Sequence, residues 1–303
     1  QIKNRITKTI TTYERKKGEL LHPEREGEKV VNSYRNSMSP FVFSAQYQQN
    51  PMPIGGGMIK QEIVSAKDIL GSARTEQTVK KAEDAFGIIG CKDNAEVAGQ
   101  ADILFLAVKP QMYPDVIGHI KDAVKPETIV VSIAPGKTIA WLTELFGKEV
   151  KLVRCMPNTP ALVGEGCTGV CKAENVTDAE MEQVLSLLNS FGKAYIVPEK
   201  LMDTVVGVSG SSPAYVFMFI EAMADAAVMD GMPRTQAYEF AAQSVLGSAK
   251  MVLETGMHPG VLKDMVCSPA GTTIEAVRVL EKSGFRSAVI EAQKACVEKA
   301  KGV

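Results

Sequence analysis

The sequence has few residues of the kinds that build metal centres or histidine-based catalytic sites. Among 303 residues it holds three histidines and six cysteines, and no two cysteines form a CxxC pair. Zinc sites and disulfide frameworks require cysteines or histidines at characteristic short spacings. We therefore expect no metal site, and we expect reduced, mostly buried thiols in a cytoplasmic protein.

The sequence also lacks an excess of charge and a long uninterrupted apolar run. Its 34 basic and 35 acidic residues give a formal net charge of -1, which offers no electrostatic basis for nucleic-acid binding. The most apolar stretch, residues 213–230, contains Glu221 and Asp225, so we expect no membrane span. We expect no signal peptide, because residues 1–17 have no apolar core. With 45% hydrophobic residues, the chain is long enough for one or two globular domains.

Residues 1–53 differ in composition from the rest of the chain. Residues 1–35 are rich in Lys, Arg, Glu and Thr and poor in large aliphatics, so we expect a largely irregular segment without a core. The run AQYQQNP, residues 45–51, resembles the part of phage terminase large subunits that links their ATPase and nuclease parts. The segment holds neither a Walker motif nor the nuclease carboxylates, so a DNA-packaging function would lack its catalytic residues.

From Met58 the pattern changes to alternating strands and helices. The strands are near-continuous apolar runs, as is typical of a parallel sheet covered on both faces. Predicted strands are residues 69–72, 101–108, 128–133, 150–156 and 194–197, and predicted helices are residues 76–86, 116–124, 139–146 and 180–191. Repeated βα units predict a doubly wound, Rossmann-like α/β domain at residues 54–198, with ligands at the carboxyl ends of its strands. Residues 199–303 show only helical patterns, which predicts a second, all-α domain.

The stretch CSPAGTTIEAVR predicts a helix start that could bind an anion. Ser268 is placed to cap the helix, and Pro269 to occupy its first position. Gly271 allows a ligand close to the backbone, while Thr272 and Thr273 add hydroxyl groups beside the free N–H groups of the first turn. No Lys or Arg stands among them, so a small carboxylate is a better ligand than a polyphosphate. The alternative is an ordinary capped helix.

Polar residues follow several of the predicted strands. Ser72 ends the strand at residues 69–72 and Arg74 follows it, and the two could hold a ribose 2′-phosphate, which favours NADPH over NADH. Lys109 is either a phosphate or carboxylate contact or a solvated loop residue. Arg154 is better explained as a structural ion pair than as a catalytic group, and Asn158 lies in a rigid turn that could present its amide to a ligand.

Seven runs, in order, resemble the pyrroline-5-carboxylate reductases, from about Gly56 to the C-terminus. They are ADILFLAVKPQ, VVSIAPGKT, RCMPNTPALVGEG, VSGSSPAYVFMFIEAMADAAV, GMPRTQAYEFAAQSVLGSAKM, LKDMVCSPAGTTIEAVRVLE and GFRSAVIEA. The resemblance implies an oxidoreductase that reduces the cyclic imino acid 1-pyrroline-5-carboxylate to L-proline with NADPH or NADH. It also implies a homodimer with interleaved helical domains, and larger rings up to a decamer.

The resemblance further assigns roles to individual residues. Thr273 would hydrogen-bond or protonate the ring nitrogen, and Glu199 would contact the substrate from the start of the helical domain. The remaining substrate-binding residues would be Ser268, Gly271 and Thr272. The cofactor contacts would be Ser72, Arg74, Asn94, Ala107, Val108, Lys109, Pro110 and Ala134.

One departure from the family concerns its first strand and glycine-rich turn. Counted without gaps, the family's strand falls on residues 41–45, and Gln46, Gln48 and Pro51 stand where the fingerprint glycines would be. Those glycines allow the tight turn and the close approach of a pyrophosphate. The alternative function is therefore an impaired fusion product that acts only as a dimeric scaffold. A related imine or β-hydroxyacid reductase is a more distant alternative, because VSGSSPAYVF offers no catalytic Lys or Asp.

Overall fold

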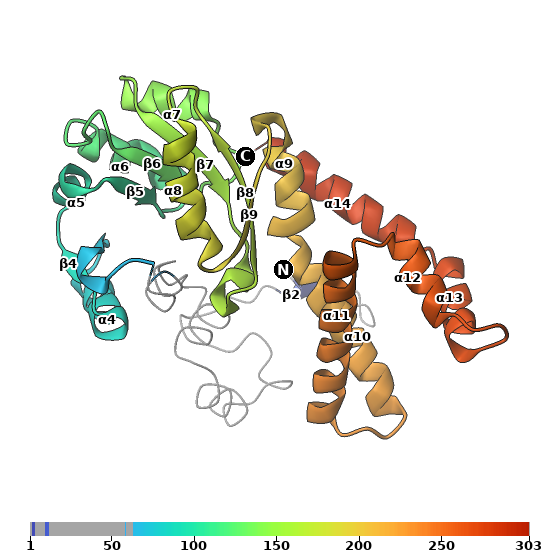
Figure 1. Cartoon of the computed structure of the whole chain (residues 1–303). Coiled ribbons are helices and arrows are strands. Elements are labelled where there is room, and N and C mark those ends of the chain that lie inside the picture. The colour runs from blue at the N-terminus through green and yellow to red at the C-terminus, as the bar shows by residue number, and fades with distance from the viewer. Residues whose placement is uncertain (1, 4–9, 12–57, 59–62, 303) are drawn as a thin grey trace. The chain divides into compact units, whose positions relative to one another are not determined.

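Figure 1 shows a computed structural model of the chain, which describes residues 2–3, 10–11, 58 and 63–302. The chain forms two compact units, Gln1–Ile54 and Gly55–Val303. In the first unit, β1 (Ile2–Lys3) and β2 (Ile10–Thr11) pair in antiparallel fashion. The expected irregular segment, the terminase-like run and the positions of the fingerprint glycines otherwise lie outside the described residues.

A five-stranded sheet forms the centre of the second unit. Its strands, in spatial order, are β5 (Ile103–Leu106), β6 (Ile129–Ser132), β7 (Lys151–Met156), β8 (Gly166–Lys172) and β9 (Gly192–Ile196). All neighbours are parallel except β7 and β8, which run antiparallel. Every residue of β6 is buried, as the sequence predicts for a strand covered on both faces.

A second, parallel pair of strands lies beside this sheet. β3 (Leu70–Ser72) pairs with β4 (Ile89–Cys91), and Leu70 and Cys91 belong to the same apolar core as Leu104 and Leu106 of β5. In a doubly wound sheet the first strand lies at the centre, between the two halves. Within residues 63–302, no strand pairs with the remaining edge of β3 or β5. The described strands therefore form the two flanks of a doubly wound sheet, and the expected first strand at residues 41–45 lies outside the described part.

Helices connect the strands of the second unit (Figure 1). They are α4 (Glu76–Phe86), α5 (Asn94–Gln100), α6 (Tyr113–Ile120), α7 (Ile139–Phe146) and α8 (Asp178–Asn189). Thr75, Asp93, Thr138 and Thr177 each accept a hydrogen bond from a backbone N–H in the first turn of the following helix. The predicted alternation of helices and strands is confirmed, and the fold is Rossmann-like.

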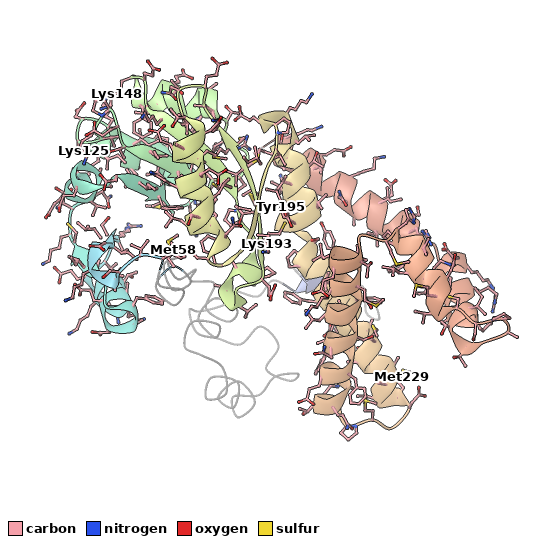
Figure 2. The ribbon with its side chains drawn as sticks, in the orientation of Figure 1. Met58, Lys125, Lys148, Lys193, Tyr195 and Met229 are labelled. Carbon is pink, nitrogen blue, oxygen red and sulfur yellow. The ribbon has the colours of Figure 1, made fainter. Side chains whose placement is uncertain are left out.

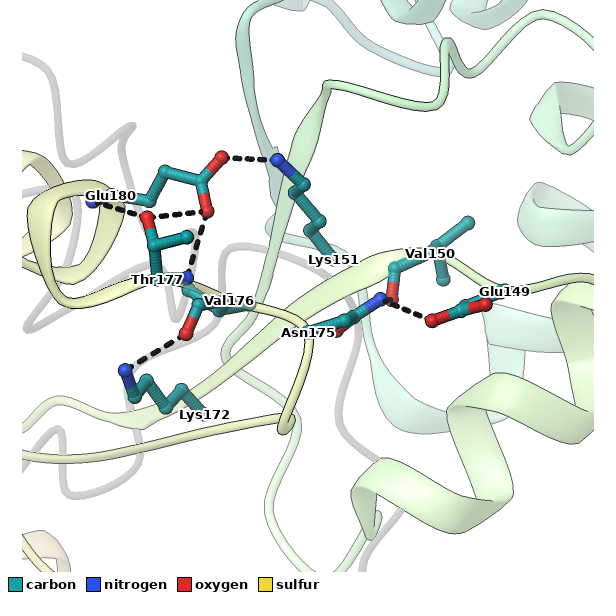
Figure 3. A network of polar contacts seen from close by, with 8 residues as sticks. All are labelled: Glu149, Val150, Lys151, Lys172, Asn175, Val176, Thr177 and Glu180. Atoms are coloured by element: carbon teal, nitrogen blue, oxygen red, sulfur yellow. Dashed lines mark hydrogen bonds and ion pairs between the residues drawn. The ribbon is translucent and has the colours of Figure 1, made fainter.

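A polar network fixes the turn between β8 and α8 (Figure 3). Thr177 and Glu180 form a reciprocal capping box, and Lys151 at the start of β7 pairs with the Glu180 carboxylate. The Lys172 ammonium donates to the Val176 carbonyl at 2.8 Å, and the Asn175 amide donates to the Val150 carbonyl at 3.2 Å. The network ties the start of α8 to the start of β7.

The capping box makes part of the stability depend on pH. Its hydrogen bonds from Lys151 and Thr177 lower the pKa of the Glu180 carboxyl from 4.5 to about 2. A carboxyl with a lowered pKa stabilises the fold above pH 4.5, and this contribution is lost as the pH falls towards 2. We expect Glu180→Gln to cost about 1 kcal/mol at pH 7 and much less at pH 3, as urea denaturation at both pH values would show. Glu182→Gln, on the exposed side of the same helix, is the control; an equal loss for Glu180→Gln at both pH values would contradict the prediction.

The chain after β9 is helical, as predicted. It comprises a 3₁₀ turn η4 (Glu199–Leu201), α9 (Met202–Val205), a π-helical turn η5 (Val206–Gly210), α10 (Ser212–Met229), α11 (Arg234–Thr255), α12 (Pro259–Val266), α13 (Thr272–Lys282) and α14 (Phe285–Lys301). The stretch Glu199–Met229 is, among the described residues, the one helix long and apolar enough by composition to cross a membrane.

The helical region buries few large side chains within one copy of the chain. The buried residues between α10 and α11 are Ala224, Ala237 and Ala241. Phe217 is 59% exposed and Phe240 is 62% exposed, and Met229 protrudes where α10 ends (Figure 2). An exposed apolar surface of this extent is typical of a protein–protein interface.

Candidate functional site

The first cluster of expected cofactor residues lies at the carboxyl ends of β3 and β4. The Ser72 hydroxyl, at the end of β3, donates a 2.7 Å hydrogen bond to the side-chain oxygen of Asn94, the first residue of α5. Arg74 is exposed just beyond β3. A hydroxyl, an amide and a guanidinium near one strand end fit the ribose phosphate of a dinucleotide. The structure therefore brings Ser72 and Asn94 together, with Arg74 two residues along the chain.

The second cluster lies at the ends of β5 and β6, which pair in register through Leu106 and Ser132. Ala107, Val108, Lys109 and Pro110 follow β5, and Ala134, almost fully buried, follows β6. Sequence reasoning missed the group beneath them: the buried Tyr113 donates to the Leu106 carbonyl at 2.7 Å and accepts from the Ser132 hydroxyl at 3.1 Å. Burial raises the pKa of Tyr113, so its hydroxyl stays protonated and keeps donating.

Glu199 lies where the helical region meets the sheet. One oxygen of its carboxylate, Oε1, accepts the Ile139 N–H at 2.7 Å and the Arg154 Nη1 at 3.3 Å. Arg154, in β7, is 3% exposed, and its Nη2 lies 3.7 Å from the Asp203 carboxylate. Burial, together with the Glu199 charge, raises the pKa of the neighbouring Cys171 thiol to about 11. Arg154 therefore forms an ion pair, as predicted, and its partner is Glu199, the residue expected to contact the substrate.

Asn158 uses its carboxamide inside the protein. Its amide donates to the Ser209 carbonyl in η5 at 3.0 Å, and its oxygen accepts the Cys167 N–H of β8 at 2.8 Å. The turn after β7 is thereby joined to the π-helical turn. The sequence predicts that the turn could present the Asn158 amide to a ligand. In the structure the side chain instead forms two internal hydrogen bonds, one to η5 and one to β8.

The stretch at residues 268–273 has a different geometry from the predicted helix start. Helix α13 begins at Thr272 with Gly271 as its N-cap, so Ser268 is not the cap and Pro269 is not the first helical residue. The Gly271 N–H donates to the Ser268 carbonyl at 3.0 Å, and Ala270 has a φ of +58°. Proline followed by a residue with positive φ is the pattern of a type II turn, which ends where the helix begins.

The positive φ of Ala270 leads to a testable prediction, because the backbone of a residue with a Cβ is strained in this conformation. In the described residues it is the single non-glycine residue with positive φ. We expect Ala270→Gly to raise the free energy of unfolding by about 0.5–1 kcal/mol, because relief of the strain exceeds the greater entropy of glycine in the unfolded chain. Urea denaturation would measure the change. Ala276→Gly, inside the helix α13 that follows this turn, should lower stability by about 1 kcal/mol, and the same sign for both variants would contradict the prediction.

The expected substrate residues form two groups, Glu199 and residues 268–273, and the described part of one chain shows no polar contact between the two groups. Ser268 and Thr272 are exposed, and Gly271 and Thr273 are half-buried. No hydrogen bond or ion pair between described residues links any of these four to Glu199. Nor does the described part contain a group of three or more His, Cys, Asp or Glu side chains that could hold a metal ion.

Comparison with known protein families finds matches for two parts of the chain. A family model described as pyrroline-5-carboxylate reductase dimerisation matches residues 199–303, and one described as NADP oxidoreductase, coenzyme F420-dependent, matches residues 53–136. The chain is 54% identical over 244 residues to pyrroline-5-carboxylate reductase of Escherichia coli strain K12, covering 80% of this chain and 91% of that protein. It is 40% identical over 243 residues to pyrroline-5-carboxylate reductase 2 of Bos taurus, covering 79% and 76%.

Solved structures give the same result. A pyrroline-5-carboxylate reductase from Coxiella burnetii superposes with a TM-score of 0.77 at 33% identity, covering 82% of this chain and 93% of that one. The pyrroline carboxylate reductase of Plasmodium falciparum, solved with NADP bound, superposes with a TM-score of 0.75 at 32% identity, covering 82% and 92%.

Proposed function

Since this chain belongs to the pyrroline-5-carboxylate reductase family, we infer that it is an NAD(P)H-dependent oxidoreductase that reduces 1-pyrroline-5-carboxylate to L-proline. The observation that carries this function is the 54% identity along 91% of a bacterial reductase. The helical region, matched by the family's dimerisation model, makes the protein self-associating.

We propose that two parts of the substrate site come together when the chain dimerises. Ser268 and Thr272 are exposed in one copy, and large apolar side chains cover the surrounding helices, which supports a site completed by a second copy. In this proposal the free N–H groups at the start of α13, with the hydroxyls of Ser268 and Thr272, bind the substrate carboxylate. Gly271 leaves room for the Ser268 hydroxyl beside the first turn, because a Cβ at position 271 would lie 2.2 Å from that hydroxyl.

The chemistry requires a hydride donor and a stabilised positive charge on the ring nitrogen. When bound, the nicotinamide supplies the hydride to the imine carbon. Thr273 donates a hydrogen bond or a proton to the lone pair of the neutral ring nitrogen. Once that nitrogen is protonated, the Glu199 carboxylate faces its N–H and stabilises its charge. The imine is readily protonated, so positioning contributes more than a strong acid, which suits a site without histidine.

The proposed cofactor contacts lie along the strand ends. Ser72, Arg74 and Asn94 would hold the ribose 2′-phosphate of NADPH, which favours the phosphorylated cofactor. Ala107, Val108, Lys109, Pro110 and Ala134 would line the rest of the cofactor. The support is the buried brace of Tyr113 and Ser132, which fixes the ends of β5 and β6.

Titration with cofactor, followed by turnover, tests the function directly. NADPH and NADH are added to the purified full chain while cofactor fluorescence is measured, and then 1-pyrroline-5-carboxylate is added while absorbance at the reduced-nicotinamide band is recorded. Micromolar binding with turnover is the expected result. A folded, self-associated protein that binds neither cofactor would instead favour the scaffold function.

The proposal extends to organisation and location. Domain limits at residues 53/54 and 198/199 are supported by the matches to residues 53–136 and 199–303. A larger assembly, up to a decamer, is supported by the extent of exposed apolar surface.

A cytoplasmic enzyme without nucleic-acid or membrane partners is supported by the near-neutral charge and by free cysteines. The terminase-like origin of residues 1–55 stays a prediction that rests on the run AQYQQNP.

A further inference from the structure

We propose that Arg154 is a positioning residue: it fixes the Glu199 carboxylate so that one oxygen is held by the protein and the other is left for the ring nitrogen of the substrate. The inference rests on the proposed function, because it takes Glu199 to contact the cyclic imine. Arg154 itself lies in the sheet and acts through Glu199.

The hydrogen bonds on Glu199 are unevenly shared between its two oxygens. Oε1 accepts both the Ile139 N–H at 2.7 Å and the Arg154 Nη1 at 3.3 Å. Oε2 accepts none from a described residue, although a carboxylate beside arginine is often held through both oxygens. Arg154 instead directs Nη2 towards Asp203. With its side chain 36% exposed, Glu199 is accessible to a ligand that uses Oε2.

The charges of the cluster suit a cationic substrate. The Arg154 side chain is 4% exposed, and a buried guanidinium requires facing carboxylates. One carboxylate would neutralise it, but both Glu199 and Asp203 lie within 4 Å of it. The three side chains together carry a formal charge of -1, which complements the protonated imine that accepts the hydride.

The cluster also connects the substrate residue to the cofactor side of the sheet. Ile139 is the first residue of α7, and the loop before it begins just after β6 at the expected cofactor contact Ala134. Arg154 lies in register with Ser132 at the end of β6. Arg154 and the start of α7 therefore hold Glu199 at a fixed place relative to the strand ends that would carry the nicotinamide.

A double-mutant cycle in the full chain tests the proposal. The variants are Arg154→Met, Glu199→Gln and their combination, measured for kcat and KM with 1-pyrroline-5-carboxylate at saturating NADPH. We expect Arg154→Met to lower kcat/KM about tenfold or more, with the Kd for NADPH changed less than about twofold. Because Arg154 acts through Glu199, the combined variant should be within about twofold of Glu199→Gln alone.

Two further variants separate positioning from a structural role. Lys151→Met removes a paired cation from the same strand, and it should lower the thermal midpoint while leaving KM for the imine unchanged. Arg154→Lys keeps the charge but loses the planar fork, and it should raise KM several-fold, even if Arg154→Met fails to fold.

The outcomes distinguish this inference from the function on which it rests. Losses that multiply in the combined variant, an equal loss of NADPH binding, or an unchanged KM in Arg154→Lys would each overturn the positioning role while leaving the reductase function intact. A Glu199→Gln variant with unaltered turnover would overturn both the substrate role of Glu199 and the inference. Absence of turnover in the wild-type chain would refute the function itself.

Discussion

Replacing Thr273 with valine is expected to lower kcat/KM for 1-pyrroline-5-carboxylate by about 10²- to 10³-fold. Valine keeps the shape of threonine but removes the hydroxyl that we assign to the ring nitrogen. Because Thr273, in the first turn of α13, is assigned to the ring nitrogen of the substrate and not to the cofactor, the Kd for NADPH should change little. Steady-state kinetics with both substrates varied, together with a cofactor titration, measures the two effects.

Thr273→Ser is the matched control for this prediction. Serine retains the hydroxyl and loses only a methyl group, so we expect it to keep activity within about tenfold of the wild type. A valine variant with normal kcat/KM would show that the ring nitrogen takes its hydrogen bond from another group. Equal losses for serine and valine would point to packing at the start of α13 instead of hydrogen bonding.

Charges placed on the exposed phenylalanines of the α10–α11 hairpin are expected to prevent self-association. The double variant Phe217→Glu/Phe240→Glu would bury unpaired carboxylates in an apolar interface, which should raise the dissociation constant by about 10²-fold or more. Sedimentation velocity over a range of concentrations measures this change. Reductase activity should fall together with association, because the proposed substrate site draws on two copies of the chain.

The control for charge alone is Gln183→Glu, an exposed position on α8 outside the helical region. It adds a negative charge without touching the apolar surface, and it should leave both association and activity unaltered. Normal association of the double phenylalanine variant would mean that the interface uses another part of the exposed apolar surface. A monomer that retains full turnover would contradict a site shared between copies.

Buried strands that appear in the sequence as nearly continuous apolar runs can be predicted from the sequence alone. β6 and β7 lie close to their predicted positions because both consist mainly of apolar residues, interrupted only by Ser132 in β6 and by Lys151 and Arg154 in β7. β8 is missing from the prediction, since GCTGVCK has glycine or a polar residue at four of its positions, Gly166, Thr168, Gly169 and Lys172, which leaves no continuous apolar run. Its place in the sheet comes from antiparallel pairing with β7, a contact that no local pattern encodes.

The site is less predictable than the fold because its contacts join distant parts of the chain. Glu199 is 45 residues from Arg154 and 60 residues from Ile139, so neither partner could be identified from spacing. The helix start at residues 268–272 was misplaced because Ala270 adopts a positive φ that alanine disfavours. The roles given to individual site residues by family resemblance stay predictions.

The small alanine contacts between α10 and α11 have a consequence for how the protein responds to dilution. Three alanines bury far less apolar area than the phenylalanines and methionines that the same helices leave exposed. We therefore expect association with a second copy to stabilise the folded form of this region, by an amount that increases with protein concentration. We expect the thermal midpoint of the helical region to rise with protein concentration, so that dilution alone destabilises one half of the enzyme while the strand-based half keeps its own core.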